Sequence, residues 1–489
     1  MKTTSPLRFL IIVLSLLAIA LSWWRVGSAN AGLVTRRWVQ DGVPLTYVAP
    51  AGAQNMPGVV IAHGFSGSSQ LMQGYSLGLA RAGYATISVD FAGHGANPRP
   101  LSLAAPSTPN QRDGSALQAD LDVAYAALLA QEGVDGSRVA ILGHSMGSGA
   151  AMTAGIDQPE RYAAVLAISP TGANVTADLP RNLHLQAGQL EPQFAANAER
   201  LLAEAGGSHP PTAEGGGREF QLIPSVEHIS ILFSPTSHGA ARAWLDATLG
   251  HTSAEAYEDR RIVWYGMHLA AVVALAIACA PLLPIAPAAE FAHRAPVWGL
   301  VMGPFLATAA LFLIGQFVEL STLGGMLVGG ALALWFALFG LAWLAIGFRP
   351  PAPQWADLGW GLALFGLLTL AFGVLAQVVW LPWWMIGARL GRWLFIALAC
   401  VPWQLAAGLA GGRRWLWWLG QSGLIGAGLV AAVVVVPSLG FVVLLVPLIP
   451  LLVGLMSLLG GVVQRPWAMA IGNAAFFGWV LAVVFPLAG

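Results

Sequence analysis

Charge, lysine and cysteine are scarce in this 489-residue sequence. Only 9% of its residues are charged, and Lys2 is its single lysine, so nearly all positive charge is carried by arginine. The two cysteines, Cys279 and Cys400, both fall in long apolar stretches. The first half therefore contains neither a disulfide framework nor a cysteine-type metal centre. We expect no metal and no cofactor.

The scarcity of charge is uneven along the chain. Residues 262–489 carry seven arginines and three acidic residues, and they hold 16 of the 20 tryptophans. A stretch of that length with so little charge is typical of a membrane domain. Residues 30–261 carry 13 arginines against 20 acidic residues, a net charge of −7. This negative charge argues against nucleic acid as a partner.

The amino terminus has the pattern of an export signal. Lys2 and Arg8 precede a 16-residue apolar run, Phe9 to Trp24. The pattern fits either a cleaved signal peptide, with a small-x-small site at residues 29–31, or an uncleaved signal anchor. Paired tryptophans at the end of the run favour the anchor, because tryptophan prefers the membrane interface. We expect a signal segment at 1–30, a catalytic domain at 31–252, a linker at 253–261 and a membrane domain at 262–489.

The membrane domain is predicted to contain about eight helices. Its apolar spans lie at 262–284, 297–318, 323–347, 357–380, 393–410, 415–436, 439–461 and 467–487. With the catalytic domain outside the cell, seven basic residues fall on the inner side: Lys2, Arg8, Arg294, Arg349, Arg413, Arg414 and Arg465. Four fall outside: Arg260, Arg261, Arg389 and Arg392. Because positive residues concentrate on the cytoplasmic side, this bias predicts a multi-pass cell-membrane protein with an extracytoplasmic catalytic domain.

Between the two membrane segments, short apolar runs alternate with helical patterns. The expected strands and helices lie at 33–39, 43–48, 59–62, 71–82 (helix), 85–89, 115–131 (helix), 163–168, 183–186, 191–205 (helix), 220–223 and 235–249 (helix). This alternation predicts a mostly parallel sheet with helices on both faces. Only about a dozen residues join the strands ending at Ile168 and starting at Leu183, too few for a cap domain.

The most informative motif runs from Gly143 to Gly147. Four apolar residues precede Gly-His-Ser-Met-Gly, and small residues at helical spacing follow it. This order predicts a strand, a tight turn that exposes the hydroxyl of Ser145, and a closely packed helix. A side chain at either flanking glycine would collide with neighbouring backbone. The backbone N–H of Met146 would then lie at a helix N-terminus, where it can stabilise an oxyanion.

A serine nucleophile needs a base and an orienting carboxylate, expected on loops after later strands in the order acid, then histidine. Glu191 is the single carboxylate in the loop after the strand at 183–186, and Asp178 on the preceding connector is the alternative acid. His228 lies in the loop after the strand at 220–223 and is the candidate base. His238, ten residues later, is expected to be a surface or helix-start histidine. The N–H of Phe65, which follows a strand in His-Gly-Phe, is the second candidate oxyanion donor.

These residues together resemble the α/β-hydrolase superfamily over about residues 33–249. The resemblance is carried, in the expected order, by His63-Gly64, Asp90-x-x-Gly93-His94-Gly95, Gly143-His144-Ser145-Met146-Gly147, Gly188-x-x-Glu191 and His228. It implies an α/β-hydrolase fold without a cap domain, and a catalytic triad of Ser145, His228 and Glu191. The loop at 90–95 is expected to shape the site rather than to do chemistry.

The sequence thus predicts a membrane-bound serine hydrolase, carboxylesterase or lipase-like, that acts through an acyl-enzyme intermediate. Its expected partners are a small-molecule ester or lipid substrate and membrane lipid; the sequence does not specify whether it has a protein partner. Two alternatives stay open. The same triad serves acyltransferases and serine peptidases, and a transport or assembly protein can carry an accessory hydrolase domain.

Overall fold

The computed structural model describes residues 6–101, 114–212, 214–253, 256–284, 295–411 and 414–489. The chain divides into two compact units. The sheet unit comprises Trp24–Trp264 with the short segment Val378–Pro382. The helical unit comprises Met1–Trp23, Tyr265–Gln377 and Trp383–Gly489.

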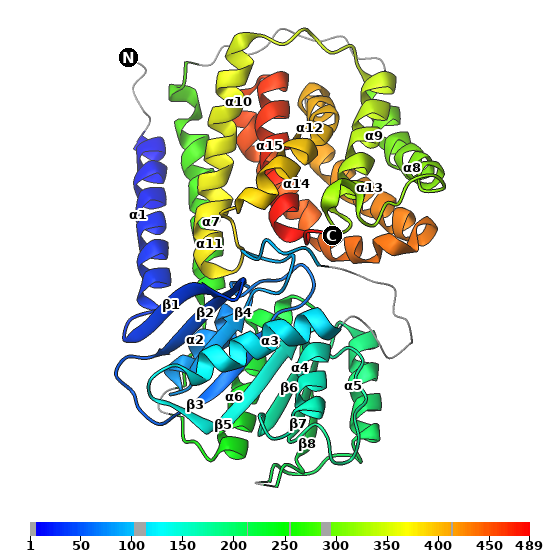
Figure 1. Ribbon diagram of the computed structural model, residues 1–489. Coiled ribbons are helices and arrows are strands. Elements are labelled where there is room, and N and C mark those ends of the chain that lie inside the picture. The colour runs from blue at the N-terminus through cyan, green and yellow to red at the C-terminus, as the bar shows by residue number, and fades with distance from the viewer. Residues whose placement is uncertain (1–5, 102–113, 213, 254–255, 285–294, 412–413) are drawn as a thin grey trace. The chain divides into compact units, whose positions relative to one another are not determined.

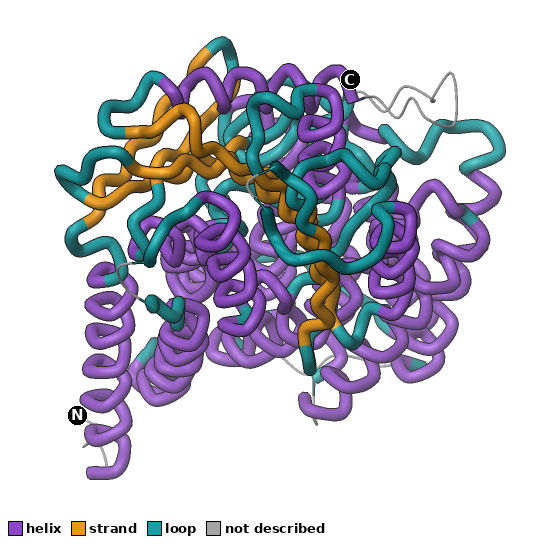
Figure 2. The backbone as a smooth tube through the Cα atoms, turned by 90° about the horizontal axis from the view of Figure 1, so that it is seen from below, coloured by secondary structure: helices purple, strands orange, loops and turns teal. Residues whose placement is uncertain are grey.

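The described part of the sheet unit contains one eight-stranded sheet, which Figure 2 shows as a continuous band of strands. The strands are β1 (Leu33–Gln40), β2 (Val43–Pro50), β3 (Met56–Ala62), β4 (Ala85–Val89), β5 (Val134–His144), β6 (Ala164–Ile168), β7 (Leu183–Gly188) and β8 (Arg218–Ile223). Their order across the sheet is β1-β2-β4-β3-β5-β6-β7-β8. Strands β1 and β2 pair antiparallel, β2 pairs antiparallel with β4, and all later pairs are parallel.

The local sequence explains the strands that were predicted. The hairpin β1–β2 turns at Asp41 and Gly42, which both have positive φ (49° and 77°) as a two-residue hairpin turn requires. Every residue of β3 is buried, as expected for a central strand of a parallel sheet covered on both faces. The prediction of a mostly parallel sheet is confirmed.

Helices cover both faces of the sheet (Figure 1). One apolar core lies under α3 (Gly114–Leu129), α4 (Met146–Asp157) and α5 (Pro192–Glu204), and the other lies under α2 (Gln73–Arg81) and α6 (Pro235–Leu249). Helix α4 packs very close to the sheet, since a Cβ on Gly155 would lie 2.4 Å from Val165 Cγ2. Residues 169–182, which connect β6 to β7, contain no helix, as the short connector predicted.

The helical unit consists of long apolar helices, so the prediction of an all-helical second half is confirmed. Its elements are α1 (Pro6–Ser28), α7 (Arg261–Cys279), η2 (Ala280–Leu282), α8 (Pro296–Ile314), η3 (Leu323–Gly325), α9 (Gly329–Gly347), α10 (Trp355–Leu368), the π-helical turn η4 (Thr369–Gly373), α11 (Val374–Val379), α12 (Gly387–Ala410), α13 (Arg414–Val435), η5 (Pro437–Leu448), α14 (Ile449–Val463) and α15 (Pro466–Val484). Helices α1 and α7 each extend across the boundary between the two units.

Nine helical segments among the described residues are long and apolar enough to cross a membrane. One is α1 and the other eight correspond to the predicted spans, with α10 to α11 forming one segment and η5 with α14 forming another. The third span was placed too early, because α9 begins at Gly329 rather than 323. Residues before it turn at Gly324 and Gly325 (φ 68° and 72°), and Met326 bridges to Leu487.

Helix α12 begins before the predicted fifth span at 393–410, and this places two arginines inside the helix. Arg389 and Arg392 were expected at a junction between spans, but α12 already begins at Gly387. Arg389 is 1% exposed and donates to the carbonyl oxygens of Ala482 (2.5 Å) and Phe485 (2.8 Å), at the C-terminal end of α15. Carbonyl groups at the end of a helix lack partners within the helix, and a positively charged side chain satisfies them. Arg389 therefore has a structural role. Lys2, Arg294 and Arg413 lie outside the described residues.

Candidate active site

Ser145 lies in a sharp turn between β5 and α4. Its backbone has φ 52° and ψ −119°, a conformation that residues with side chains rarely adopt. The flanking glycines make the turn possible: a Cβ on Gly143 would lie 2.1 Å from the Gly147 oxygen, and one on Gly147 would lie 2.5 Å from the His63 oxygen. The Ser145 N–H donates to the Ile168 oxygen (2.9 Å), which fixes the turn against the end of β6.

His228 lies beside this serine, in the loop that follows β8. Its Nε2 is 3.0 Å from the Ser145 Oγ, within hydrogen-bonding distance across 83 residues of sequence. The ring of Phe194, on α5, stacks on the imidazole with 4.3 Å between centroids and 23° between planes. The His228 side chain is 12% exposed, so solvent reaches only its edge.

Glu191 holds the opposite edge of the imidazole. Its Oε2 is 2.7 Å from His228 Nδ1, and the residue is 2% exposed. The other oxygen, Oε1, accepts from the Gly188 N–H (2.6 Å) and from the Ser169 hydroxyl (2.7 Å). These donors stabilise a charged, buried carboxylate, which would otherwise be costly to remove from water. Glu191 occupies the N-cap position of α5 but makes no side-chain capping bond, because its carboxylate turns into the site.

The two contacts of His228 define its proton positions. A carboxylate accepts hydrogen bonds, so the Nδ1 that faces Glu191 carries the proton. The Nε2 lone pair then faces the Ser145 hydroxyl, which donates to it. This arrangement suits an imidazole that takes a proton from the serine.

The two candidate oxyanion donors belong to backbone segments that adjoin Ser145. Met146 is the first residue of α4, so its N–H is at a helix N-terminus. Phe65 follows Gly64, whose missing Cβ would lie 2.9 Å from the Ser145 Cβ. The backbone of the loop after β3 therefore passes directly beside the candidate nucleophile, which is the approach that an oxyanion donor needs.

The loop after β4 supports that approach. His63 accepts from the Phe91 N–H through Nε2 (3.1 Å), and its Nδ1 donates to the Gly64 oxygen (2.7 Å). Burial lowers the pKa of His63 below its ordinary value, so the ring is neutral near pH 7. Asp90 accepts from the N–H groups of Ser69 (2.7 Å) and Ala96 (2.9 Å). These bonds shape the loops, as the sequence predicted for residues 90–95.

The two alternative candidates lie elsewhere. Asp178 is exposed on the β6–β7 connector, where its carboxylate attracts the Arg218 guanidinium electrostatically. His238 lies in the first turn of α6, the helix-start position that was one of its two expected places, and it is half-buried. Its Nε2 donates to the Leu232 oxygen (2.9 Å), and its ring contacts Tyr75 edge-on at 4.3 Å.

Three residues that support the site were not singled out from the sequence. Ser169 binds the acid, and Phe194 stacks on the imidazole. The third is His144, whose Nε2 donates to the His228 backbone oxygen (2.9 Å). Burial, followed by repulsion from His228, lowers the pKa of His144 well below its ordinary value. A usable signal existed for Ser169, which directly follows β6 at the sheet edge that carries the other site residues.

Among the described residues, no group of three or more histidine, cysteine or acidic side chains is placed to hold a metal ion. The sequence-based expectation that no metal or cofactor takes part stays a prediction.

Comparisons with known proteins support this architecture. Residues 54–202 match the family model described as serine aminopeptidase, S33. The match and the sheet confirm the resemblance of the first half to α/β-hydrolases and its α/β-hydrolase-like fold. A comparison with curated protein sequences finds no match.

Similar solved structures include three hydrolases. A predicted CIB-like hydrolase from Thermoplasma acidophilum is 16% identical, with 44% of this chain and 98% of that chain covered at a TM-score of 0.34. The esterase Est22 is 16% identical, with coverages of 48% and 85% and a TM-score of 0.34. A soluble variant of monoglyceride lipase from Saccharomyces cerevisiae is 14% identical, with coverages of 44% and 95% and a TM-score of 0.32.

Proposed function

We propose that this protein is a membrane-bound serine hydrolase that cleaves carboxylic esters, lipid esters among them, through a triad of Ser145, His228 and Glu191. The observation that carries the proposal is one continuous line of hydrogen bonds. The serine hydroxyl lies 3.0 Å from the imidazole, and the imidazole lies 2.7 Å from a buried carboxylate. The coarser conclusion, that the first half is a hydrolase domain, rests on the family match as well.

In the acylation step, the Ser145 oxygen attacks the ester carbonyl while its proton passes to His228 Nε2. The oxyanion that forms is stabilised by the N–H groups of Met146 and Phe65, and Glu191 stabilises the positive imidazolium. The C–O bond of the ester then breaks. His228 gives its proton to the departing alcohol, leaving an acyl group on Ser145.

Deacylation repeats the same steps with water. His228 takes a proton from a water molecule, whose oxygen attacks the acyl-enzyme carbonyl, and the carboxylic acid leaves as the proton returns to the Ser145 oxygen. No redox step or external cofactor is needed to balance either half-reaction.

Glu191, rather than Asp178, is the acid in this proposal. A triad carboxylate must reach the Nδ1 side of the imidazole, and Glu191 lies within 2.7 Å of it while fixed by Ser169 and Gly188. Asp178 is exposed to solvent. Electrostatic stabilisation of an imidazolium is much weaker from an exposed carboxylate, because water screens it.

The membrane part of the proposal rests on the nine apolar helices among the described residues. We infer that 1–30 is a signal anchor, 31–252 the catalytic domain, 253–261 a linker and 262–489 a multi-pass membrane domain. The catalytic domain is proposed to lie outside the cytoplasm, as is the C-terminus after eight further spans. A reporter that is active only in the cytoplasm, fused after Gly489, should be silent, and a strong signal would refute this orientation.

Fluorophosphonate labelling of the full-length protein in membranes tests the chemistry. The wild-type protein should be labelled on Ser145. Ser145→Ala should lose the label, and its turnover of short esters should fall by several powers of ten. Full labelling of the Ser145→Ala protein would refute the nucleophile. His228→Ala should be nearly as inactive as Ser145→Ala, because the triad acts as a unit.

A peptidase is the second candidate, since the matching family model is described as a serine aminopeptidase. The same triad would then attack an amide, and His228 would protonate an amine instead of an alcohol. Parallel assays with matched ester and N-terminal amide substrates separate the two functions. Turnover of the amide above that of the ester would favour the peptidase.

A further inference from the structure

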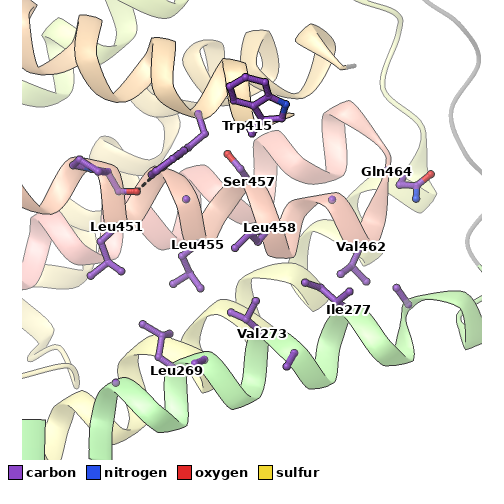
Figure 3. A pocket seen from close by; sticks show the side chains of 18 residues that line it. Leu269, Val273, Ile277, Trp415, Leu451, Leu455, Ser457, Leu458, Val462 and Gln464 are labelled. Atoms are coloured by element: carbon purple, nitrogen blue, oxygen red, sulfur yellow. Dashed lines mark hydrogen bonds between the residues drawn. The ribbon is translucent and has the colours of Figure 1, made fainter. Parts of the chain in front are cut away.

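The helical unit contains a cavity of about 1120 Å³ between α7, α13 and α14 (Figure 3). We call it the slot. Its lining extends along α7 from Gly266 to Ile277, continues to Ala280 at the start of η2, and runs along α14 from Pro450 to Val462. At the helical rise of 1.5 Å per residue, the α7 side is about 20 Å long.

Small residues line the slot on both helices at helical spacing. They are Gly266, Ala270 and Ala274 on α7, and Gly454, Ser457 and Gly461 on α14. Between membrane helices such residues ordinarily let two backbones approach closely. Gly454 makes room for the Trp418 indole, whose Nε1 would lie 3.1 Å from an added Cβ, but the rest of the space that these residues free is left open. Close packing of α7 against α14 therefore does not explain them.

The remaining lining is almost wholly apolar. Figure 3 shows Leu269, Val273 and Ile277 facing Leu455, Leu458 and Val462 across the slot. Trp418 also lines it, and its Nε1 is occupied because it donates to the Pro450 oxygen (2.8 Å). Among the described residues, no charged side chain lines the slot.

One end of the slot is polar. The side chain of Gln464, which is exposed, lies beyond Val462 and closes the lining at the C-terminal end of α14. An amide both donates and accepts hydrogen bonds. The slot therefore has a long, mostly apolar body, interrupted by the Ser457 hydroxyl, and an exposed hydrogen-bonding side chain at one end.

This polarity points to one kind of occupant. The three helices belong to candidate membrane spans, so their surroundings are hydrocarbon rather than water. A helix with its side chains is about 10 Å across. Extended hydrocarbon chains are thinner and match the apolar lining. We propose that the slot binds the acyl chains of a membrane glycerolipid, with the ester and head group at Gln464.

The proposed site goes beyond the hydrolase function, since all of its lining belongs to the helical unit. It predicts a lipid held in a fixed place on the protein surface, in addition to the lipids that surround any membrane protein. The site is expected to persist when catalysis is abolished at Ser145.

Photo-crosslinking of the full-length protein in phosphatidylcholine vesicles tests the slot. The probe is phosphatidylcholine with a diazirine in the middle of one acyl chain, and labelled peptides are identified by mass spectrometry. Labelling per residue at 266–280 and 450–464 should exceed that on the exposed apolar face of α1 severalfold, because van der Waals contact with two facing helices holds a chain longer than contact with one helix surface. Equal labelling of α1 and the slot would refute a specific site.

Substitutions that fill the slot provide the control. Ala270→Trp and Ala274→Trp place an indole in it and should lower slot labelling to the level seen on α1, because the indole occupies the space that the acyl chain would fill. Ala276→Trp, on the same helix but outside the lining, should leave labelling unchanged. Ala270 is exposed, so its variant should fold, and an unchanged thermal midpoint would verify this.

Three results would overturn the proposal. Slot labelling that resists both tryptophans would mean that lipid does not enter the cavity. Ultraviolet-induced protein dimers linked through α7 or α14 would mean that a second copy covers it. Loss of slot labelling in Ser145→Ala would tie the label to catalysis. Labelling retained in Ser145→Ala supports the slot whether or not the proposed hydrolase activity is found.

Discussion

The substitution Glu191→Gln separates the proposed triad from a merely structural hydrogen-bond network. It keeps the size and shape of the side chain while replacing one oxygen by an NH₂ group. Two donors, Ser169 Oγ and Gly188 N–H, converge on the Oε1 position. The amide oxygen must therefore occupy that position, because an NH₂ there would face two donors. The NH₂ group then faces His228.

That orientation forces the imidazole into the wrong tautomer. An NH₂ cannot accept from the Nδ1–H of His228, so the proton moves to Nε2 and Nδ1 accepts from the amide. Nε2–H then points at the Ser145 oxygen, 3.0 Å away, with no lone pair left to take the serine proton. The geometry of the site is preserved and only the direction of its hydrogen bonds is reversed.

The expected loss in kcat is about four powers of ten, as for the equivalent change in serine proteases, which corresponds to about 5 kcal/mol of transition-state stabilisation. KM should change little, because Glu191 is buried behind the imidazole and does not face the substrate. Glu191→Asp shortens the side chain by one carbon and withdraws the carboxylate by about 1 Å. It should cost about a hundredfold, the scale of such a misplacement.

The assay is turnover of a short soluble ester by full-length protein in detergent, with fluorophosphonate labelling rate as a second readout. Asp178→Asn is the matched control, since it also turns a carboxylate into an amide, but at an exposed position. It should leave both readouts near wild type. If Asp178→Asn lost activity and Glu191→Gln kept it, both the choice of acid and the tautomer reasoning would be wrong.

Three further predictions concern packing and pH. His144→Phe leaves the His228 backbone oxygen without its donor, which costs about 1–3 kcal/mol when the acceptor is kept from water. If that cost falls on the placement of the imidazole, kcat should fall ten- to a hundredfold with KM nearly unchanged, and a rise in KM alone would contradict a positioning role. Burial lowers the pKa of His63 and of His144, so the unfolded chain takes up protons that the folded one does not as pH falls below about 6.5. Stability should be fully present above that pH and fall by at most about 1.4 kcal/mol per pH unit for each histidine below it; the thermal inactivation midpoint should be lower at pH 5.5 than at 7.5, with a smaller difference in His144→Phe. In the helical unit, Gly340→Ala places a Cβ 2.0 Å from the backbone nitrogen of Trp403 and should lower the thermal midpoint. Gly366→Ala, whose Cβ would meet nothing within 4 Å, should leave the midpoint unchanged. Equal midpoints for the two variants would mean that α9 and α12 can move apart without cost.

Much of the sheet unit was predictable because each signal was local. The hairpin at Asp41-Gly42 and the apolar runs before His63 and Ser145 each specify one element by themselves. The order of parallel strands then places their carboxyl ends at one edge of the sheet. Loops that follow those strands must converge there, so the sequence could bring Ser145, Glu191 and His228 into one candidate site before any distance was known.

Supporting contacts of the site were harder to predict, because they depend on how backbone and side chain turn locally. Ser169 donates to Glu191 from a backbone with φ 47°, and the local sequence does not predict this positive φ. His144 is part of the motif itself, yet nothing in a strand pattern tells that its ring will donate to a backbone oxygen 84 residues away. Residues of this kind are fixed by tertiary packing rather than by local propensity.

In the helical unit, length and composition identify the spans but not the faces through which they pack. Apolar residues surround these helices on all sides, since lipid and protein interior are equally apolar, and no stripe marks the inward face. Arg389 therefore looked like a marker of membrane side in the sequence, although its guanidinium binds the carbonyls of α15. The slot escaped sequence reasoning for the same reason: its small residues would also fit a tight helix contact, and only the separation of α7 from α14 distinguishes the two. A distinction that depends on the distance between two helices is a property of the packed unit, and it is there that a lipid site has to be sought.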